Sequence, residues 1–364
     1  MLKLSTQPFL KDFSERAGST VIGSMPHTNE KKAVEIIMKN LDIPVWPQLP
    51  KKSFRESMYT QYSEGFPCLV VDEKNQKIFF DTDTDTLSEL EKFYEKIIAD
   101  DLDYFRISQD YAAGFYEFIS QLTTYPRLKS GATPLTTVKG QITGPITFGL
   151  KVTDKNNRSI FYNEQFIDVV VKALTMKARW QIRQLRTMNY ELRTIMFIDE
   201  PYLSAFGSAF TQISREEVIK YLNEVSDGIH KEHSLSGVHC CGNTDWSVIM
   251  DTNIDIISFD AYNFFDGLTL YPEKLNKFFD RGGILAWGIV PSSEQINSET
   301  VDSLTENFIK KAEYLVKKGI SETAVKNRYL ITASCGVGSL SEELAEKIIV
   351  TTKDVAENLI RINL

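Results

Sequence analysis

The sequence predicts an α/β fold, a (β/α)8 barrel of the TIM type with an insertion between its second and third strands. Short runs rich in β-branched residues alternate with long amphipathic stretches, and this alternation is typical of repeated strand–helix units. Eight runs of this kind can be counted, which is the number of strands in a closed barrel. They are residues 19–24, 44–49, 135–142, 193–199, 236–241, 254–260, 284–290 and 329–334.

Helical patterns fill most intervals between these strands, most clearly at 164–191, 215–232, 301–318 and 341–359. The interval between the second and third strands is much longer than the others. It contains a hairpin pattern, CLVVDEKNQKIFFD, and helical patterns at about 86–100 and 109–122. This stretch is too short for a large core of its own. We therefore expect one barrel domain over residues 1–364, with residues 50–134 as an insertion over the barrel mouth.

The composition excludes several classes of protein. A content of 42% hydrophobic and 25% charged residues is that of an ordinary globular protein. The net charge of -8 argues against a non-specific nucleic-acid partner. No apolar run approaches the roughly 20 residues that cross a bilayer, and the start MLKLSTQPFLKDF lacks the pattern of a signal peptide. A cytoplasmic protein with no membrane partner is expected, with its four cysteines reduced.

Four candidate metal ligands lie at the ends of predicted strands: His239, Cys241, Asp260 and Cys335. His239 and Cys241 are two residues apart, so on a strand both side chains project from the same face. One nitrogen, two sulfur and one oxygen ligand suit a tetrahedral zinc ion, and the carboxyl ends of barrel strands are where the chemistry of this fold lies. The sequence therefore predicts a zinc site, although an aspartate such as Asp260 is also a common helix cap.

Other polar residues fall at the same predicted edge of the barrel. Ser24 and Asp199 end the first and fourth predicted strands, His27 follows in IGSMPHT, and Glu200 comes directly after Asp199. We expect Ser24, Asp199 and Glu200 to bind substrate, and Asp199 and His27 to act in catalysis. Simpler alternatives stay open, because the two acidic residues could cap the next turn and the serine and histidine could be ordinary loop residues.

These segments resemble a known group of enzymes. GVHCCGNTDW, followed by ISFD and later by ASCGVG, resembles the zinc-site pattern of the catalytic domain of cobalamin-independent methionine synthases. It also resembles the methylcobamide:thiol methyltransferases of the uroporphyrinogen decarboxylase superfamily. VIGSMPHT and FIDEPYL are similar to the methionine synthase segments that hold the amino-acid substrate, whereas the Gly-Asn after Cys241 is closer to the methylcobamide branch.

The resemblance implies a zinc-dependent methyltransferase that acts on a thiol. In these families zinc binds the substrate thiol, lowers its pKa and holds the thiolate for attack on an activated methyl group. The implied acceptor is homocysteine or a coenzyme M-like thiol. The same resemblance implies that His239, Cys241 and Cys335 hold the zinc, and that Asp260 is the weakly held ligand that leaves when the substrate sulfur arrives.

The sequence departs from methionine synthases where the substrate and the donor would bind. The segment after the second strand reads PKKSFRESMYTQYSEG and is basic, so Glu56 is the candidate anchor for a substrate ammonium group. TGPITFGLK lacks the tryptophan that follows Gly-Pro in the family, which weakens the case for a stacked folate. Two donors therefore stay open: a methyl-corrinoid protein, docked at the barrel mouth, and methyl-folate.

One alternative function comes from the same superfamily. Uroporphyrinogen decarboxylase is a metal-free enzyme that acts on a polycarboxylate, and it needs an arginine-rich N-terminal segment. Near IGSMPHT this chain has only Arg16, and a zinc-ligand set would have no purpose in such an enzyme. A non-catalytic metal-binding scaffold is a third hypothesis, which a convergent set of polar strand ends disfavours.

Overall fold

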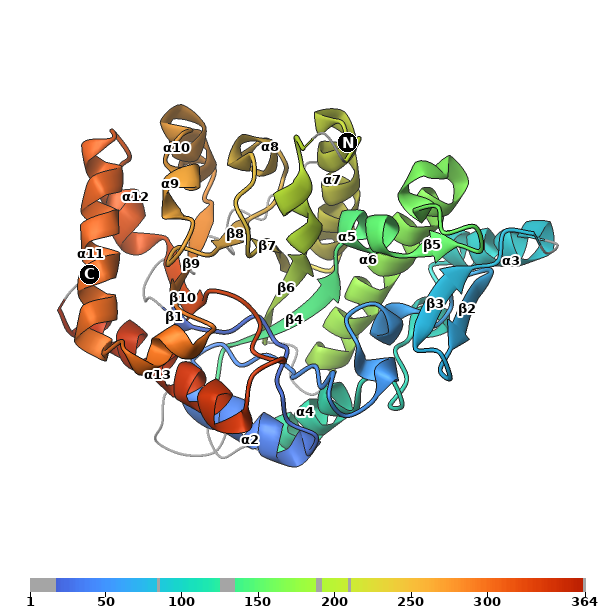
Figure 1. Ribbon diagram of the computed structural model, residues 1–364, viewed down its shortest axis with the longest axis horizontal. Coiled ribbons are helices and arrows are strands. Elements are labelled where there is room, and N and C mark those ends of the chain that lie inside the picture. Colours follow the sequence, from blue (N-terminus) through green and yellow to red (C-terminus); the bar gives the residue numbers. More distant parts are fainter. Residues whose placement is uncertain (1–17, 84–85, 125–134, 188–191, 209–210, 363–364) are drawn as a thin grey trace.

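The centre of the molecule is a strongly curled parallel sheet of seven strands (Figure 1). The computed structural model describes residues 18–83, 86–124, 135–187, 192–208 and 211–362, so Arg16 lies outside the described residues. The order of strands around the sheet is β1, β10, β9, β8, β7, β6 and β4. The strands are β1 (Gly18–Ser19), β4 (Thr137–Thr143), β6 (Arg193–Asp199), β7 (Leu235–Cys240), β8 (Ile256–Phe259), β9 (Ile284–Val290) and β10 (Tyr329–Ala333). The predicted parallel α/β barrel is confirmed.

The second predicted strand corresponds to residues 43–48, which lie between the two edges of this sheet. On one side, Val45 forms a parallel bridge with Lys139 of β4. On the other side, Gln48 forms a parallel bridge with Ser24, which lies beyond β1. The segment contains two prolines, which have no N–H group for a ladder, so it pairs by isolated bridges instead of a regular strand. Its contacts on both sides complete the ring of eight chain segments.

Helices surround the sheet. Each of the four clearest helical patterns corresponds to a helix: α6 (Glu164–Arg186), α7 (Arg215–Lys231), α11 (Val301–Lys317) and α13 (Glu342–Arg361). The remaining outer helices are α2 (Glu30–Asn40), α5 (Pro145–Lys151), α8 (Trp246–Met250), α9 (Phe265–Leu268), α10 (Pro272–Asp280) and α12 (Glu322–Asn327). Helix α7 begins where predicted because Ser214 and Glu217 form a reciprocal capping box. No helix in the described ranges is long and apolar enough to cross a membrane.

Side chains alternate between the two faces of the sheet. The outer face packs against the helices in the main core, and the inner face encloses a smaller apolar cluster that includes Ile195, Phe197 and Leu235. Residues of the same parity on a strand face the same way. Asp199 on β6 and His239 on β7 therefore continue the inward-facing rows to the carboxyl ends of the strands.

The insertion carries the predicted hairpin and helices. Strands β2 (Leu69–Asp72) and β3 (Lys77–Phe80) pair antiparallel, as the CLVVDEKNQKIFFD pattern predicts. A two-residue strand, β5 (Thr153–Asp154), adds to β3 and was too short to be recognised in the sequence. The other elements are η2 (Phe54–Glu56), η3 (Thr60–Tyr62), α3 (Thr86–Ile98), η4 (Leu102–Phe105) and α4 (Ala113–Thr124). In Figure 1 the hairpin and α3 extend to one side of the barrel, while α4 packs against α2.

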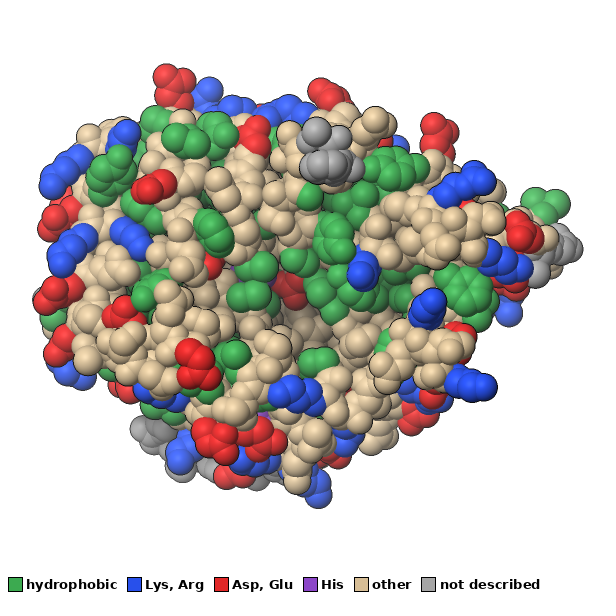
Figure 2. Space-filling view, in the orientation of Figure 1, with side chains coloured by type: hydrophobic (Ala, Val, Ile, Leu, Met, Phe, Trp, Pro, Cys, Tyr) green, Lys and Arg blue, Asp and Glu red, His purple; other side chains and the backbone are tan. Residues whose placement is uncertain are grey.

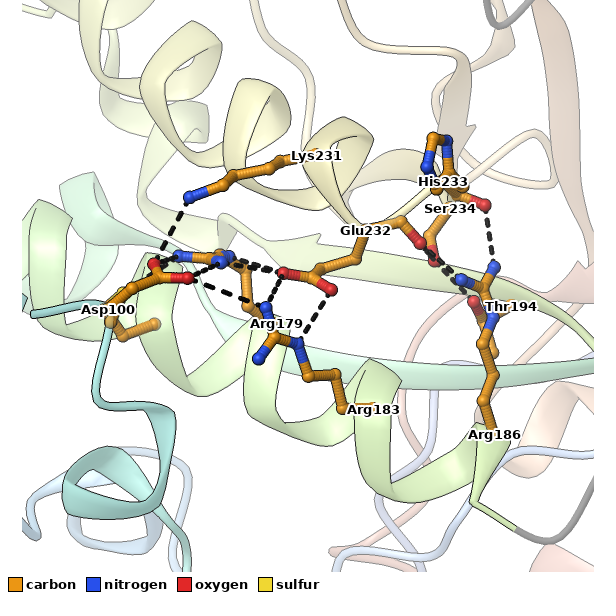
Figure 3. A network of polar contacts seen from close by, with 10 residues as sticks. Asp100, Arg179, Arg183, Arg186, Thr194, Lys231, Glu232, His233 and Ser234 are labelled. Carbon is orange, nitrogen blue, oxygen red and sulfur yellow. Dashed lines mark hydrogen bonds and ion pairs between the residues drawn. The ribbon is translucent and has the colours of Figure 1, made fainter. Parts of the chain in front are cut away.

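A network of ion pairs attaches the insertion to the outer helices (Figure 3). The guanidinium of Arg179, on α6, donates to both carboxylate oxygens of Asp100 at 2.5 and 2.9 Å. Its Nε donates to Glu232, next to α7, at 2.8 Å. Arg183 and Lys231 extend the network to the same two carboxylates. Because Arg179 is almost fully buried and bidentate, this network is more than a set of surface pairs.

Candidate metal centre

His239, Cys241 and Cys335 meet at the carboxyl end of the barrel. His239 is near the end of β7, Cys241 follows that strand, and Cys335 lies two residues beyond β10. A ring nitrogen of the histidine and the two Sγ atoms all lie within 4.8 Å of one another. Strands β8 and β9 separate β7 from β10 in the sheet, so the curl of the sheet is what brings the two cysteines together.

The imidazole of His239 is oriented with one nitrogen left free. Its Nδ1 lies 3.0 Å from the Oγ of Ser258 on β8, while its buried Nε2 has no hydrogen-bond partner among the described residues. A serine partner at one ring nitrogen orients the ring and leaves the other nitrogen available for a metal. An unsatisfied buried nitrogen beside two thiols is what a zinc site without its ion would contain, so these residues fit that ion.

The two thiols influence each other. The neighbouring Cys335 thiol, and after it the His239 imidazole, hold the pKa of Cys241 well below its usual range. The same contact with Cys241 and burial raise the pKa of Cys335. Ser292 anchors the loop that carries Cys335, because its Oγ donates to the Cys335 carbonyl at 2.7 Å and accepts from the Cys335 N–H at 2.9 Å. One sulfur is thus prepared as a thiolate, the form that binds metals.

Asp260 does not belong to this group of ligand atoms. Its carboxylate accepts hydrogen bonds from the backbone N–H and the side-chain amide of Asn263, each at 2.8 Å. Burial raises the pKa of Asp260. The structure thus gathers three of the four predicted ligands, and Asp260 closes the turn after β8 without capping the helix that follows.

A cavity of about 340 Å³ opens above the three ligands. It is lined by Ile22, Ser24, Gln48, Pro50, Glu56, Met58, Asp199, Pro201, His239, Cys241, Cys335, Gly336, Gly338 and Ser339. Its volume is at the lower end for small-molecule sites. Figure 2 shows a molecule hollowed near the centre of this face, with charged side chains of both signs scattered around the periphery.

Three residues predicted to bind substrate line this cavity: Ser24, Glu56 and Asp199. Glu56 accepts a hydrogen bond from the N–H of Ala113 at 3.3 Å through Oε1, and burial raises its pKa to about 7. The Oε2 atom of Glu56 and the Oδ1 atom of Asp199 are buried and have no partner in the described part of the chain. Two carboxyl groups thus each offer a cavity ligand one unsatisfied oxygen.

Ser24 lies against the loop that carries Cys335. A Cβ atom added to Gly336 would lie 2.2 Å from the Ser24 hydroxyl oxygen, so a larger residue at position 336 would displace that hydroxyl. The Ser24 carbonyl also accepts the N–H of Val337 at 3.1 Å. These contacts bind the end of the first strand to the Cys335 loop and set the serine beside the metal ligands.

Glu200 does not line the cavity. Its two carboxylate oxygens accept the N–H groups of Ile146 and Thr147, at 2.9 and 2.7 Å. These residues form the first turn of α5, whose free N–H groups attract a carboxylate. Glu200 therefore caps α5 from outside the helix, and it does not cap the turn that follows it, which was the predicted alternative to substrate binding.

His27 also lies away from the cavity lining. Its buried ring places Nε2 3.2 Å from Glu346 and 3.7 Å from Glu342, both on α13. These three residues could group around a cation, but the ammonium of Lys32 already pairs with both carboxylates at 3.0 and 2.8 Å. The cluster attaches the loop after β1 to the first turns of α13, and the structure does not bring His27 to the substrate cavity.

Several residues around the cavity were missed in the sequence. Gln48 and Met58 line it from segments without a recognisable motif. Lys139 is fully buried and donates to the carbonyl of Ile22, which is part of the cavity lining. The signal for Lys139 was a single charge within the strand TVKGQIT, whose seven residues are all buried. A charged residue in a fully buried strand is rare enough to mark a functional or paired position.

No family model and no curated protein matches this chain. Among solved structures, 29 chains match it. One of them is the structure of a B12-independent methionine synthase from Shewanella sp. W3-18-1 in complex with selenomethionine. That match has a TM-score of 0.44 and 16% sequence identity, and it covers 67% of each chain. At these values it carries no functional inference.

Proposed function

We propose that this protein is a zinc-dependent methyltransferase that binds a small thiol and methylates its sulfur. The observation that carries the proposal is the meeting of His239, Cys241 and Cys335 within 4.8 Å at the wall of a substrate-sized cavity. Three protein ligands beside a cavity are typical of a catalytic zinc site, whereas structural sites are closed by four. The resemblance of the strand-end segments to thiol methyltransferases supports the same reading.

The residues of the chain have separate roles in this proposal. His239, Cys241 and Cys335 would hold the ion, and Ser258 and Ser292 fix the first and last of them in place. Zinc at this position would lower the pKa of a substrate thiol, so that the thiol gives its proton to solvent and is held as a thiolate. The sulfur then forms a bond to the methyl carbon while the bond between that carbon and the donor breaks. The electron pair of the broken bond stays with the donor.

The cavity favours an acceptor thiol that carries an ammonium group. Glu56 and Asp199 each present an unsatisfied oxygen, and among the described lining residues none is lysine or arginine. An ammonium group can donate to both carboxylates, while the sulfonate of a coenzyme M-like thiol would meet two acidic groups and no cation. An amino thiol such as homocysteine is therefore the proposed acceptor, with Ser24 available to its polar atoms.

The same lining argues against the decarboxylase alternative. A polycarboxylate substrate requires several cationic side chains, because each buried carboxylate needs a partner. The described lining of the cavity supplies acidic and neutral groups instead. A decarboxylase of the uroporphyrinogen type is the less favoured function.

The features that bear on the methyl donor lie outside the cavity proposed for the acceptor thiol. A second cavity, of about 620 Å³, lies on the other side of residues 54–60 and is lined in part by Lys77, Lys151 and Lys155. Glu56 and Met58 border the first cavity, while Ser57 and Tyr59 border the second. Lysines beside the site suit a donor with carboxylate groups, such as methyl-folate, and the open face suits a methyl-corrinoid protein.

Zinc content and methyl transfer test the proposal together. Purified protein is expected to contain about one zinc per chain by elemental analysis, and Cys335→Ser to contain almost none. Methylcobalamin and methyl-folate are then crossed with homocysteine and coenzyme M, and methylated homocysteine is expected with one donor. Unchanged zinc in Cys335→Ser would sink the ligand assignment. Transfer to no thiol from either donor, by zinc-loaded protein, would sink the proposed reaction.

A further inference from the structure

Gln48 is a residue of the cavity wall whose backbone is fixed beside the first strand. It is 6% exposed and lines the cavity. Its N–H donates to the Gly23 carbonyl at 3.0 Å, and its carbonyl accepts the N–H of Met25 at 2.8 Å. These bonds hold Gln48 next to Ser24, which lines the same cavity.

The insertion holds the side-chain amide of Gln48. The Nε2 atom donates to Oε1 of Gln61 at 2.8 Å and to the hydroxyl oxygen of Tyr62 at 3.0 Å. Both partners are fully buried residues of η3. An amide nitrogen has two hydrogens, so Nε2 of Gln48 has none left for a ligand.

Two backbone carbonyls determine which way this amide points. The Tyr62 hydroxyl donates its single hydrogen to the Gln141 carbonyl at 2.9 Å, so it can only accept from Gln48. Gln61 donates through Nε2 to the Tyr111 carbonyl at 2.8 Å, so its Oε1 faces Gln48. Turning the Gln48 amide over would set its oxygen against two acceptors. The orientation with Nε2 toward the insertion is therefore the one that the network allows.

The side-chain atom that Gln48 has left for the cavity is Oε1. Its side-chain hydrogen bonds within the described part of the chain are both made through Nε2, so Oε1 is free to accept. Glu56 Oε2 and Asp199 Oδ1 also lack partners among the described residues, and they line the same cavity. An ammonium group has three hydrogens to donate. Gln48 thus adds a neutral acceptor to the two carboxylates.

We propose that Gln48 is a specificity-determining residue: its Oε1 accepts a hydrogen bond from the ammonium group of the acceptor thiol, while Gln61 and Tyr62 position the amide. The inference rests on the proposed function for the identity of the ligand. A neutral acceptor adds a hydrogen bond without adding a third negative charge beside two carboxylates. Neither Gln61 nor Tyr62 is among the described residues that line the cavity, so the insertion acts on substrate choice through Gln48.

Gln181 on α6 provides a matched control. It is a second buried glutamine, whose Oε1 accepts the indole N–H of Trp46 at 2.9 Å and whose Nε2 donates to the Gln141 carbonyl at 3.1 Å. It has no exposed surface and is not part of the described cavity lining. Gln181→Met therefore removes the same kind of side chain as Gln48→Met and leaves the cavity acceptors in place.

Thiol binding to zinc-loaded protein tests the proposal by calorimetry. Homocysteine is compared with 4-mercaptobutyrate, which has the same thiol and carboxylate but no amine. Gln48→Met is expected to weaken homocysteine binding about 10-fold or more, the size of a lost hydrogen bond to a charged group, and to change 4-mercaptobutyrate binding less than about threefold. Gln181→Met is expected to change neither by more than about threefold. Equal losses for both thiols in Gln48→Met would overturn the proposal, because a general structural role produces that result.

Tyr62→Phe tests the positioning role. Alone it is expected to weaken homocysteine binding about threefold to tenfold, because the Gln48 amide loses one of the two groups that hold it. On the Gln48→Met background it is expected to weaken binding no further. An additional loss on that background would overturn the proposed route from the insertion through Gln48. If Gln48→Met does not fold, Tyr62→Phe takes its place in the comparison of the two thiols.

A pair of ligands without sulfur separates this inference from the proposed function. 2-Aminobutyrate is homocysteine without its sulfur, and butyrate lacks the amine as well. In an NMR titration, metal-free wild-type protein is expected to bind 2-aminobutyrate at least about threefold more tightly than butyrate, and Gln48→Met to lose most of this preference. A wild type that binds neither thiol would sink the proposed function, while this pair still reports on the acceptor. A preference that is absent from the wild type, or unchanged in Gln48→Met, would overturn the inference.

Discussion

Two regions of this molecule place charged and polar groups out of water in opposite ways. In the network between the insertion and the outer helices, the charges of Arg179, Asp100 and Glu232 all have close partners (Figure 3). In the cavity at the barrel mouth, His239 Nε2, Glu56 Oε2 and Asp199 Oδ1 are buried and have none within the described ranges. Buried polar groups are normally satisfied, and exceptions gather at functional sites.

The difference separates stabilisation from binding. A satisfied network lowers the free energy of the folded chain whether or not a ligand is present. An unsatisfied oxygen or nitrogen costs about 1–3 kcal/mol until a metal or substrate completes it. We therefore expect changes in the network to alter stability without altering the proposed chemistry. Changes in the cavity should alter the proposed chemistry and leave the stability of the metal-free protein nearly unchanged or raise it.

The largest expected effect comes from two adjacent cysteines, Cys240 as the last residue of β7 and Cys241 directly after it. Cys241→Ser should remove zinc and lower methyl transfer at least about 100-fold, while the unfolding free energy of the metal-free protein changes by less than about 1 kcal/mol. Cys240 is fully buried in the main core, so Cys240→Ser should keep its zinc and lose about 1–3 kcal/mol. Elemental analysis, a transfer assay and urea unfolding of both variants check this. Equal loss of zinc from both variants would contradict the assignment of Cys241 as a ligand and Cys240 as a core residue.

Arg179→Met should break the network. The change leaves Asp100 and Glu232 without their shared guanidinium, and we expect it to lower the unfolding free energy by about 2–4 kcal/mol. The upper end is reduced because the Asp100 side chain is 38% exposed and water can compensate it. Urea unfolding measures the loss, and zinc content with homocysteine affinity should stay at the wild-type values. A variant of normal stability that fails to bind homocysteine would contradict the assignment of roles.

The network also makes a pH prediction with a definite sign. Arg179 holds the pKa of Asp100 well below its usual range. Burial acts to raise the pKa of Glu232, but the hydrogen bonds from Arg183 and Arg179 outweigh it, so the pKa of Glu232 is lowered. A lowered carboxyl pKa adds stability above the unfolded value of about 4, and this stability is lost as the pH falls. The stability difference between the wild type and Arg179→Met should therefore narrow as the pH falls below about 4. A difference that stays constant down to pH 2 would rule out the ionic origin of the effect.

The sequence was sufficient for the fold because the evidence for it was local and repeated. β-branched runs such as RTIMFID and ILAWGIV, separated by capped amphipathic helices, require a parallel sheet covered on its outer face. The His-x-Cys spacing was enough to place His239 and Cys241 on one face. Cys335 joined them because all strands of such a barrel present their carboxyl ends at the same edge.

What the sequence could not supply was the direction of side chains in loops. Glu200 adjoins Asp199, yet its carboxylate turns to the N–H groups of α5. Asp260 has the expected strand-end position but accepts bonds from Asn263. Lys139 was not singled out because its contacts, the Ile22 carbonyl and the Phe197 ring, lie on segments far away in the sequence. Contacts of this kind appear only when the sheet is assembled.

The smallest effect expected is the contribution of Glu56 to the pH dependence of stability, which has the sign opposite to that of Asp100. Burial raises the pKa of Glu56 from its ordinary value of 4.5 to about 7. Between these pH values the folded chain holds a proton that the unfolded chain has lost, so stability decreases as the pH rises through that window.

Glu56→Gln has no such proton and keeps an oxygen for the Ala113 N–H. At pH 8 we expect the metal-free variant to be more stable than the wild type by about 1–2 kcal/mol, with the two curves converging at pH 4.5. Urea unfolding across this range measures the gap. Parallel curves would mean that Glu56 already has a compensating partner, and its role as the anchor for a substrate ammonium would then have to be abandoned.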